Sequence, residues 1–136
     1  MRKLETSVIL LAGLLMLCSP LLAHHGSRAS YDVNKQITMT GTVTDFVWSN
    51  PHSQVYFDVK DEKGNVVSWG AEDDTPLHLL KKGWTKDILK PGDQVTITLC
   101  PSKAGTPRGL LAKVVLANGR VLPGLAPPLG GGTPAE

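Results

Sequence analysis

The stretch Ile37–Val59, ITMTGTVTDFVWSNPHSQVYFDV, decides the fold. Its first half alternates apolar or small residues with threonines. The apolar phase consists of Ile37, Met39, Gly41 and Val43. This period of two, in β-branched residues, is what a half-buried strand requires. At Asp45 the phase slips by one residue, so that Phe46 and Trp48 continue the apolar phase. Such a slip predicts a β-bulge, and Gly41 permits a sharp bend nearby.

A turn separates this strand from a second one. Asn50-Pro51 ends the first strand because proline has no N–H for the ladder, and asparagine before proline favours a turn. Beyond it the apolar phase returns at Val55, Phe57 and Val59, with Gln54 and Tyr56 on the opposite face. A long, bent and bulged first strand is typical of a small closed barrel, in which that strand pairs on both sides.

The remaining elements follow in an order that indicates one architecture. We expect strands at 36–48, 52–60, 66–71, 95–100 and 110–116, and a short last strand at 120–122. Asp74-Thr75-Pro76 predicts the start of a short helix, and Gly83 predicts its end. Three strands, a helix and two strands are the order of the OB-fold, a five-stranded Greek-key barrel. The sequence therefore predicts an all-β domain with one short helix over residues 36–122, with a short sixth strand.

The two ends of the chain have different compositions from this domain. Arg2 and Lys3 precede an apolar run and a cleavage site after Ala23, which predicts a signal peptide over residues 1–23 and export to the periplasm. Cys18 offers a lipoprotein alternative, which the bulky Leu17 before it disfavours. The apolar run is short for a membrane span, and none is expected after cleavage. We expect an extended arm over residues 24–35 and a disordered Pro/Gly-rich tail over 123–136.

Charge and motif content exclude several function classes. The 136 residues carry a formal net charge of +2 with both signs interspersed, so no basic stripe indicates nucleic-acid binding. Metalloprotease, redox and phosphate-loop motifs are absent, and we expect no enzymatic activity. The carboxylate pair Asp73-Asp74 is explained by the helix cap. Cys100 is the only cysteine after cleavage, which favours a buried, unreactive thiol over a bridge between chains.

One candidate site surrounds the first turn. OB-folds bind ligands on the face of strands two and three, between the loops that here are 49–51 and 101–109. The predicted ligand-binding residues are Trp48, Asn50, His52, Tyr56 and Arg108. Such a polar and aromatic set suits an unknown small ligand or a periplasmic protein partner. The alternative is structural: Trp48 closes the barrel end, Asn50 shapes the turn and His52 faces water. Trp69 and Trp84 are predicted core residues.

A second candidate site is a metal site at the mature N-terminus. Cleavage after Ala23 leaves a free α-amine followed by His24 and His25, a combination that can chelate copper and, less favourably, zinc. His52 is a candidate third ligand if the arm lies along the barrel. The alternative is a solvated terminus, since metal sites normally need rigid supports.

Five short motifs resemble a known family of small exported Gram-negative bacterial proteins, catalogued as a domain of unknown function. The motifs are Ala23-His24-His25, Thr40-Gly41-Thr42-Val43, Trp48-Ser49-Asn50-Pro51-His52, Gly83-Trp84 and Leu89-Lys90-Pro91-Gly92-Asp93. The resemblance covers residues 24–122 and implies export and a single small β domain. It implies no activity. The family's usual serine and aromatic residue after His-His are replaced here by Gly26-Ser27-Arg28.

Overall fold

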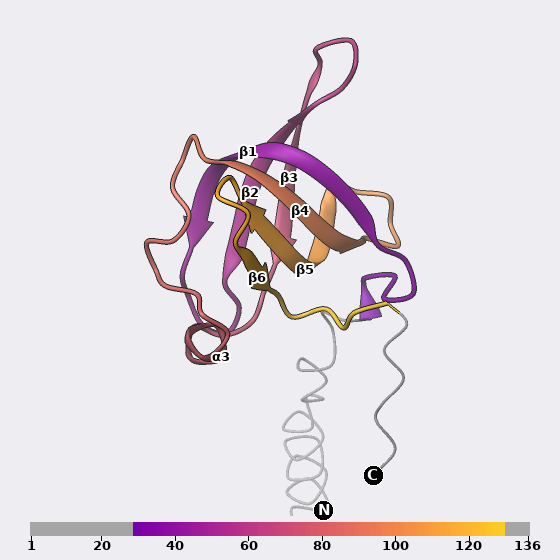
Figure 1. Cartoon of the computed structure of the whole chain (residues 1–136). Coiled ribbons are helices and arrows are strands. Elements are labelled where there is room, and N and C mark those ends of the chain that lie inside the picture. The colour runs from indigo at the N-terminus through magenta and orange to yellow at the C-terminus, as the bar shows by residue number, and fades with distance from the viewer. Residues whose placement is uncertain (1–28, 130–136) are drawn as a thin grey trace, which may run out of the picture.

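The computed structural model describes residues 29–129 of the chain. The predicted signal peptide, His24, His25 and the last part of the predicted tail lie outside these residues. The elements are β1 Ile37–Val47, β2 Gln54–Lys60, β3 Val66–Glu72, α3 Pro76–Lys81, β4 Gln94–Pro101, β5 Arg108–Leu116 and β6 Val121–Pro123. Their order and bounds confirm the predicted succession of strands with one helix (Figure 1).

The strands close into a five-stranded barrel. β1 pairs with both β2 and β4, and the sheet runs in the order β3-β2-β1-β4-β5-β6. A parallel pairing between β3 and β5 completes the ring, with Gly70 opposite Arg108 and Glu72 opposite Leu110. Among the described strands β6 pairs only with β5, and it lies outside the ring. This is the topology of an OB-fold with a sixth strand, as predicted.

β1 serves two neighbours because it changes direction along its length. Residues 37–42 pair with β4 and residues 42–47 pair with β2. The register with β2 shifts between Val43 and Asp45, which confirms the predicted bulge. At Gly41 a β-carbon would lie 2.7 Å from the backbone oxygen of Asp58, so only glycine allows the two strands this close.

The barrel interior holds the apolar phases of all five strands. Val55, Phe57, Ile97 and Leu99 are fully buried. α3 lies at the end of the barrel away from the tip of the β2–β3 hairpin (Figure 1). It contributes the buried Leu79, and Trp84 follows it, 1% exposed, with its indole N–H donating to the backbone oxygen of Pro123 at 2.9 Å. Trp84 is therefore a core residue, as predicted.

Residues beyond the predicted domain end also pack on the barrel. The sequence placed residues 123–136 in a disordered tail. In the structure, the backbone N–H groups of Gly124 and Ala126 donate to the carbonyls of Ala112 and Leu111, each at 2.8 Å, and Ala126 is 7% exposed. A β-carbon on Gly124 would lie 2.4 Å from the Leu111 oxygen. The backbone hydrogen bonds, and the close approach to β5 that the missing side chain of Gly124 allows, thus order residues 124–126, where composition alone suggests disorder.

Part of the predicted arm is also attached to the barrel. Tyr31 pairs with Ser102, and the N–H of Asp32 donates to the carbonyl of Pro101 at 2.9 Å. The Tyr31 hydroxyl donates to Glu72 Oε2 at 3.1 Å. These contacts fix residues 31 and 32 beside the end of β4. Across residues 29–129, no helix has the length and apolar character needed to cross a membrane.

Candidate functional site

A groove lies over the outer face of β2 and β3. It measures about 720 Å³, within the range of small-ligand pockets. Its lining consists of Thr44, Asp45, Tyr56, Ser68, Trp69, Gly70, Thr106, Pro107 and Arg108. Tyr56 faces outward because its neighbours Val55 and Phe57 are fully buried in the barrel. The groove thus lies on the strand face that OB-folds use for ligands.

Four residues form one row across the floor of this groove. The strand registers place Asp45 opposite Tyr56, Tyr56 opposite Gly70, and Gly70 opposite Arg108. Each of β1, β2, β3 and β5 therefore contributes one residue. The bulge in β1 matters here, because it lets Thr44 and Asp45 both be exposed at successive positions.

The guanidinium of Arg108 lies above Gly70 and is directed toward Tyr56. Its central carbon is 5.7 Å from the Tyr56 ring centroid, a cation–π distance. Arg108 Nη1 donates to Gln54 Oε1 at 3.4 Å, and the same oxygen accepts from the Tyr56 hydroxyl at 3.1 Å. A β-carbon on Gly70 would lie 2.9 Å from Arg108 Nη1, so the missing side chain makes room for the guanidinium.

The charge of Arg108 is not neutralised by an ion pair within residues 29–129. The three ion pairs there join His52 to Glu72, and His78 and Lys82 to Asp74. The backbone around Arg108 is nevertheless well fixed: its N–H donates to the Thr106 carbonyl at 2.7 Å, and the Gly70 N–H donates to the Pro107 carbonyl at 3.1 Å. Within residues 29–129 the Arg108 side chain donates to a neutral amide and lies over a neutral ring, and such an anchored cation is suited to binding an anionic group.

The structure separates the five predicted ligand-binding residues. It brings Tyr56 and Arg108 together in the groove. Trp48 instead contacts Phe46 edge to face, with ring centroids 5.7 Å apart, and packs against the core, as its structural alternative predicted. Asn50 is exposed before a cis peptide bond to Pro51. Of the two loops expected to frame the site, only residues 106–108 of the second line the groove.

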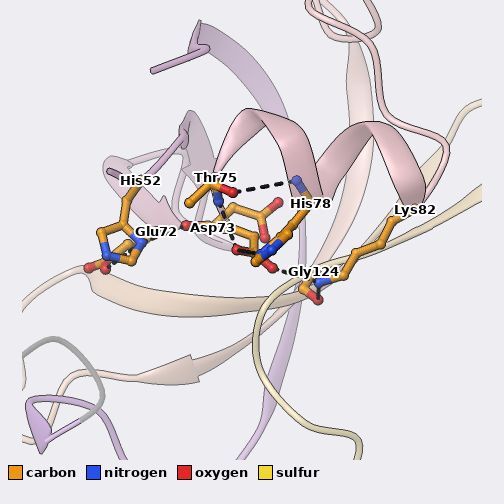
Figure 2. A network of polar contacts seen from close by, with 8 residues as sticks. His52, Glu72, Asp73, Thr75, His78, Lys82 and Gly124 are labelled. Atoms are coloured by element: carbon orange, nitrogen blue, oxygen red, sulfur yellow. Dashed lines mark hydrogen bonds and ion pairs between the residues drawn. The ribbon is translucent and has the colours of Figure 1, made fainter. Parts of the chain in front are cut away.

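His52 belongs to a separate polar network at the junction of β3 and α3 (Figure 2). Its Nδ1 lies 3.1 Å from the backbone oxygen of Asp73 and 3.4 Å from Glu72 Oε1. Because a carbonyl oxygen can only accept, Nδ1 is the protonated ring nitrogen. The Tyr31 hydroxyl donates to the other carboxylate oxygen of Glu72, and burial, together with the charge of Glu72, raises the pKa of Tyr31 to about 12. His52 therefore fixes the strand end and is engaged with protein groups.

Asp74 holds the other half of the network together. Its carboxylate accepts from the Thr75 N–H at 2.8 Å, from Lys82 Nζ at 3.0 Å and from His78 Nδ1 at 2.9 Å. Burial by itself would raise the pKa of Asp74, but these hydrogen bonds and the Lys82 charge hold it below its usual value. Lys82 Nζ also donates to the carbonyl of Gly124 at 2.9 Å, so this ion pair attaches α3 to the C-terminal segment (Figure 2).

Asp73 is the most unusual residue of this network. It is fully buried, and neither carboxyl oxygen has a hydrogen-bond partner among the described residues. Burial raises the pKa of Asp73 to about 7, and the nearby Asp74 and Leu125 N–H groups, which lie outside hydrogen-bond geometry, and the Lys82 charge partly offset that effect. Among the described residues Ser53 Oγ is also buried without a hydrogen-bond partner, and the Ser53 carbonyl accepts from the Asp73 N–H at 2.8 Å. The pair Asp73-Asp74 is thus more than a helix cap.

The predicted metal site is not assembled by the described residues. His24 and His25 lie outside them, and no group of three or more histidine, cysteine or acidic side chains in residues 29–129 is arranged to hold a metal ion. Cys100 is fully buried, and burial raises the pKa of its thiol. The prediction of a copper or zinc site at the N-terminus therefore stays a prediction.

Comparison with known proteins places the chain in one sequence family. A family profile matches residues 12–112. The chain belongs to a family of unknown function, DUF6152. The match confirms the resemblance to a family of unknown function. No curated protein and no solved structure gives a significant match to the chain.

Sequence reasoning did not find two features of the site. The partnership of Gly70 with Arg108 depends on the parallel β3–β5 pairing, which joins residues 38 positions apart and leaves no local pattern. Asp73 lies near the N–H of Leu125 in the C-terminal segment, which composition assigned to a tail. The one available signal was the adjacent carboxylate pair itself, since a second acidic residue is not needed to cap a helix.

Proposed function

We propose that this protein is an exported, periplasmic, non-catalytic binding module whose ligand occupies the Tyr56–Arg108 groove. The N-terminal sequence supports export: a basic start, an apolar run and a cleavage site after Ala23 are typical of signal peptides. The observation that carries the proposal is the groove itself. Residues from four strands and one loop line it, and its guanidinium is held in place without an ion-pair partner among residues 29–129.

Preorganisation favours a binding function for this surface. Arg108 would otherwise lose rotamer freedom when it bound a ligand, at a cost of about 1 kcal/mol or more. Gln54 and Tyr56 already restrict the side chain, and the Pro107 and Thr106 carbonyls fix its backbone. Part of the rotamer entropy that Arg108 would lose on binding a ligand is therefore already lost when the protein folds.

The proposal is tested by NMR titration of the ¹⁵N-labelled mature chain with four chemically distinct probes: citrate, spermidine, maltotriose and trialanine. We expect at least one probe to shift the amide signals of Ser68, Gly70 and Thr106 more than those of β6. Gly70→Ala should weaken that probe's binding by about tenfold, because the new methyl displaces the guanidinium. Lys113→Gln, on the same strand as Arg108 and exposed, is the matched control.

Shifts confined to residues outside the groove, or no saturable shift with any probe, would contradict the proposal. Equal binding by wild type and Gly70→Ala would also contradict it. Circular dichroism of each variant distinguishes lost binding from lost folding.

A further inference from the structure

The groove carries charges of opposite sign at its two sides. Asp45 and Arg108 are both exposed, and within residues 29–129 neither forms an ion pair. Asp45 Oδ1 accepts from the Phe46 N–H at 2.8 Å, and Oδ2 accepts no hydrogen bond from the residues that the structure describes. A simple anion that approached Arg108 would be repelled by Asp45, and a simple cation at Asp45 would be repelled by Arg108. A ligand that places a positive group at Asp45 and a negative group at Arg108 is attracted at both sides.

The spacing of the two charges limits the ligand's length. Asp45 is one strand from Tyr56, or about 5 Å. The backbone of Arg108 lies two strands from Tyr56, on the side opposite Asp45. Its side chain extends back toward Tyr56, so that the guanidinium carbon is 5.7 Å from the Tyr56 ring centroid. The two charged groups are therefore on the order of 10 Å apart. The ammonium and carboxylate of a single amino acid are too close together to reach both.

We propose that the groove takes a zwitterionic ligand, a free peptide of two or three residues, with its carboxylate on Arg108 and its ammonium on Asp45. An extended chain of this length spans about 7–11 Å, which fits the separation. The inference rests on the proposed binding function of the groove and adds the ligand class to it.

The floor between the two charges suits a peptide backbone. Because Gly70 has no side chain, the Arg108 guanidinium lies low over it and beside Tyr56, and the part of the row from Tyr56 to Asp45 is left for the peptide. Thr44 and Thr106 line the same groove, and a threonine hydroxyl can bond a peptide group as donor or acceptor. The Tyr56 ring offers an apolar surface for a small side chain. Charges set the length and direction of the ligand, and the floor accommodates its backbone.

The test compares trialanine with its two singly blocked forms, N-acetyl-trialanine and trialanine amide, by NMR titration at pH 7 and low salt. Wild type should bind trialanine about tenfold more tightly than either blocked form, as expected for loss of one charge-assisted contact. Asp45→Asn should bind trialanine and the acetylated form equally. Arg108→Gln should bind trialanine and the amide form equally. Lys113→Gln should behave as wild type.

Equal binding of all three peptides by wild type would overturn the inference, as would an unchanged preference in Asp45→Asn and Arg108→Gln. If citrate, spermidine or maltotriose shifts the groove signals and trialanine does not, the inference fails and the proposed function stands. If none of the probes shifts them, both fail. Thermal unfolding of each variant confirms that the folded state is being compared.

Discussion

Replacement of Asp73 by asparagine should remove a pH dependence of stability that the wild-type protein shows near neutrality. Asp73 is buried, and its pKa is raised from 3.8 to about 7. In the unfolded chain the carboxyl group titrates near its ordinary value of about 3.9. Between about pH 4 and pH 7 the native state therefore holds a proton that the unfolded state has lost.

The sign and size of the effect follow from this difference. Because the native state binds more protons in this window, the free energy of unfolding falls as pH rises from about 4 to about 7 and levels off above it. A rise in pKa from 3.8 to about 7 corresponds to about 4 kcal/mol over the whole window. Asp74 acts in the opposite direction, but its lowered pKa confines its contribution to pH values below about 4.

The assay is urea unfolding at a series of pH values from 4.5 to 8 at constant ionic strength, followed by tryptophan fluorescence. The buried Trp84 makes this signal sensitive to global unfolding. We expect Asp73→Asn to resemble wild type at pH 4.5, to exceed it in stability at pH 8, and to show a nearly flat profile between. Asp87→Asn removes an exposed carboxylate and is the matched control, with the wild-type slope retained.

A wild-type slope that persists in Asp73→Asn would refute the reasoning, since another group would then have to carry it. A wild-type profile that is flat between pH 4.5 and 8 would refute it as well. Either result would mean that the carboxyl group is hydrated or hydrogen-bonded in solution.

Three further predictions concern the core, the thiol and the N-terminus. Leu79→Ala should lower the free energy of unfolding by about 2–5 kcal/mol, because Leu79 is fully buried. Leu80→Ala, at a position 55% exposed on the same helix, should change it by about 0.5 kcal/mol or less. Equal effects of the two substitutions in urea unfolding would contradict the packing of α3. Cys100 in the mature chain should react with a thiol reagent only after denaturation, and rapid native labelling would contradict its burial. The copper hypothesis predicts stoichiometric Cu(II) uptake that is lost in His24→Ala/His25→Ala; equal affinity in calorimetric titration would exclude it.

The sequence by itself determined the elements of this fold. The alternation at residues 37–43, the slip at Asp45 and the cap at Thr75 are local patterns, and a strand, a bulge or a helix start depends mainly on neighbouring residues. Their order was enough to predict the barrel topology. Trp84 was also predictable as a core residue, because a large apolar side chain just after a helix end packs on the same core.

Only the tertiary structure decided what these elements bring together. The parallel closure of β3 against β5 puts Arg108 over Gly70 and beside Tyr56, while His52 and Trp48 turn to other partners. The C-terminal residues 124–126 resemble a linker in sequence, but their backbone N–H groups bond to β5. Lys82, at the end of α3, donates to the Gly124 carbonyl, close to the buried Asp73. These features are contacts between distant segments, and their energies depend on burial and charge in three dimensions, which no local sequence pattern records.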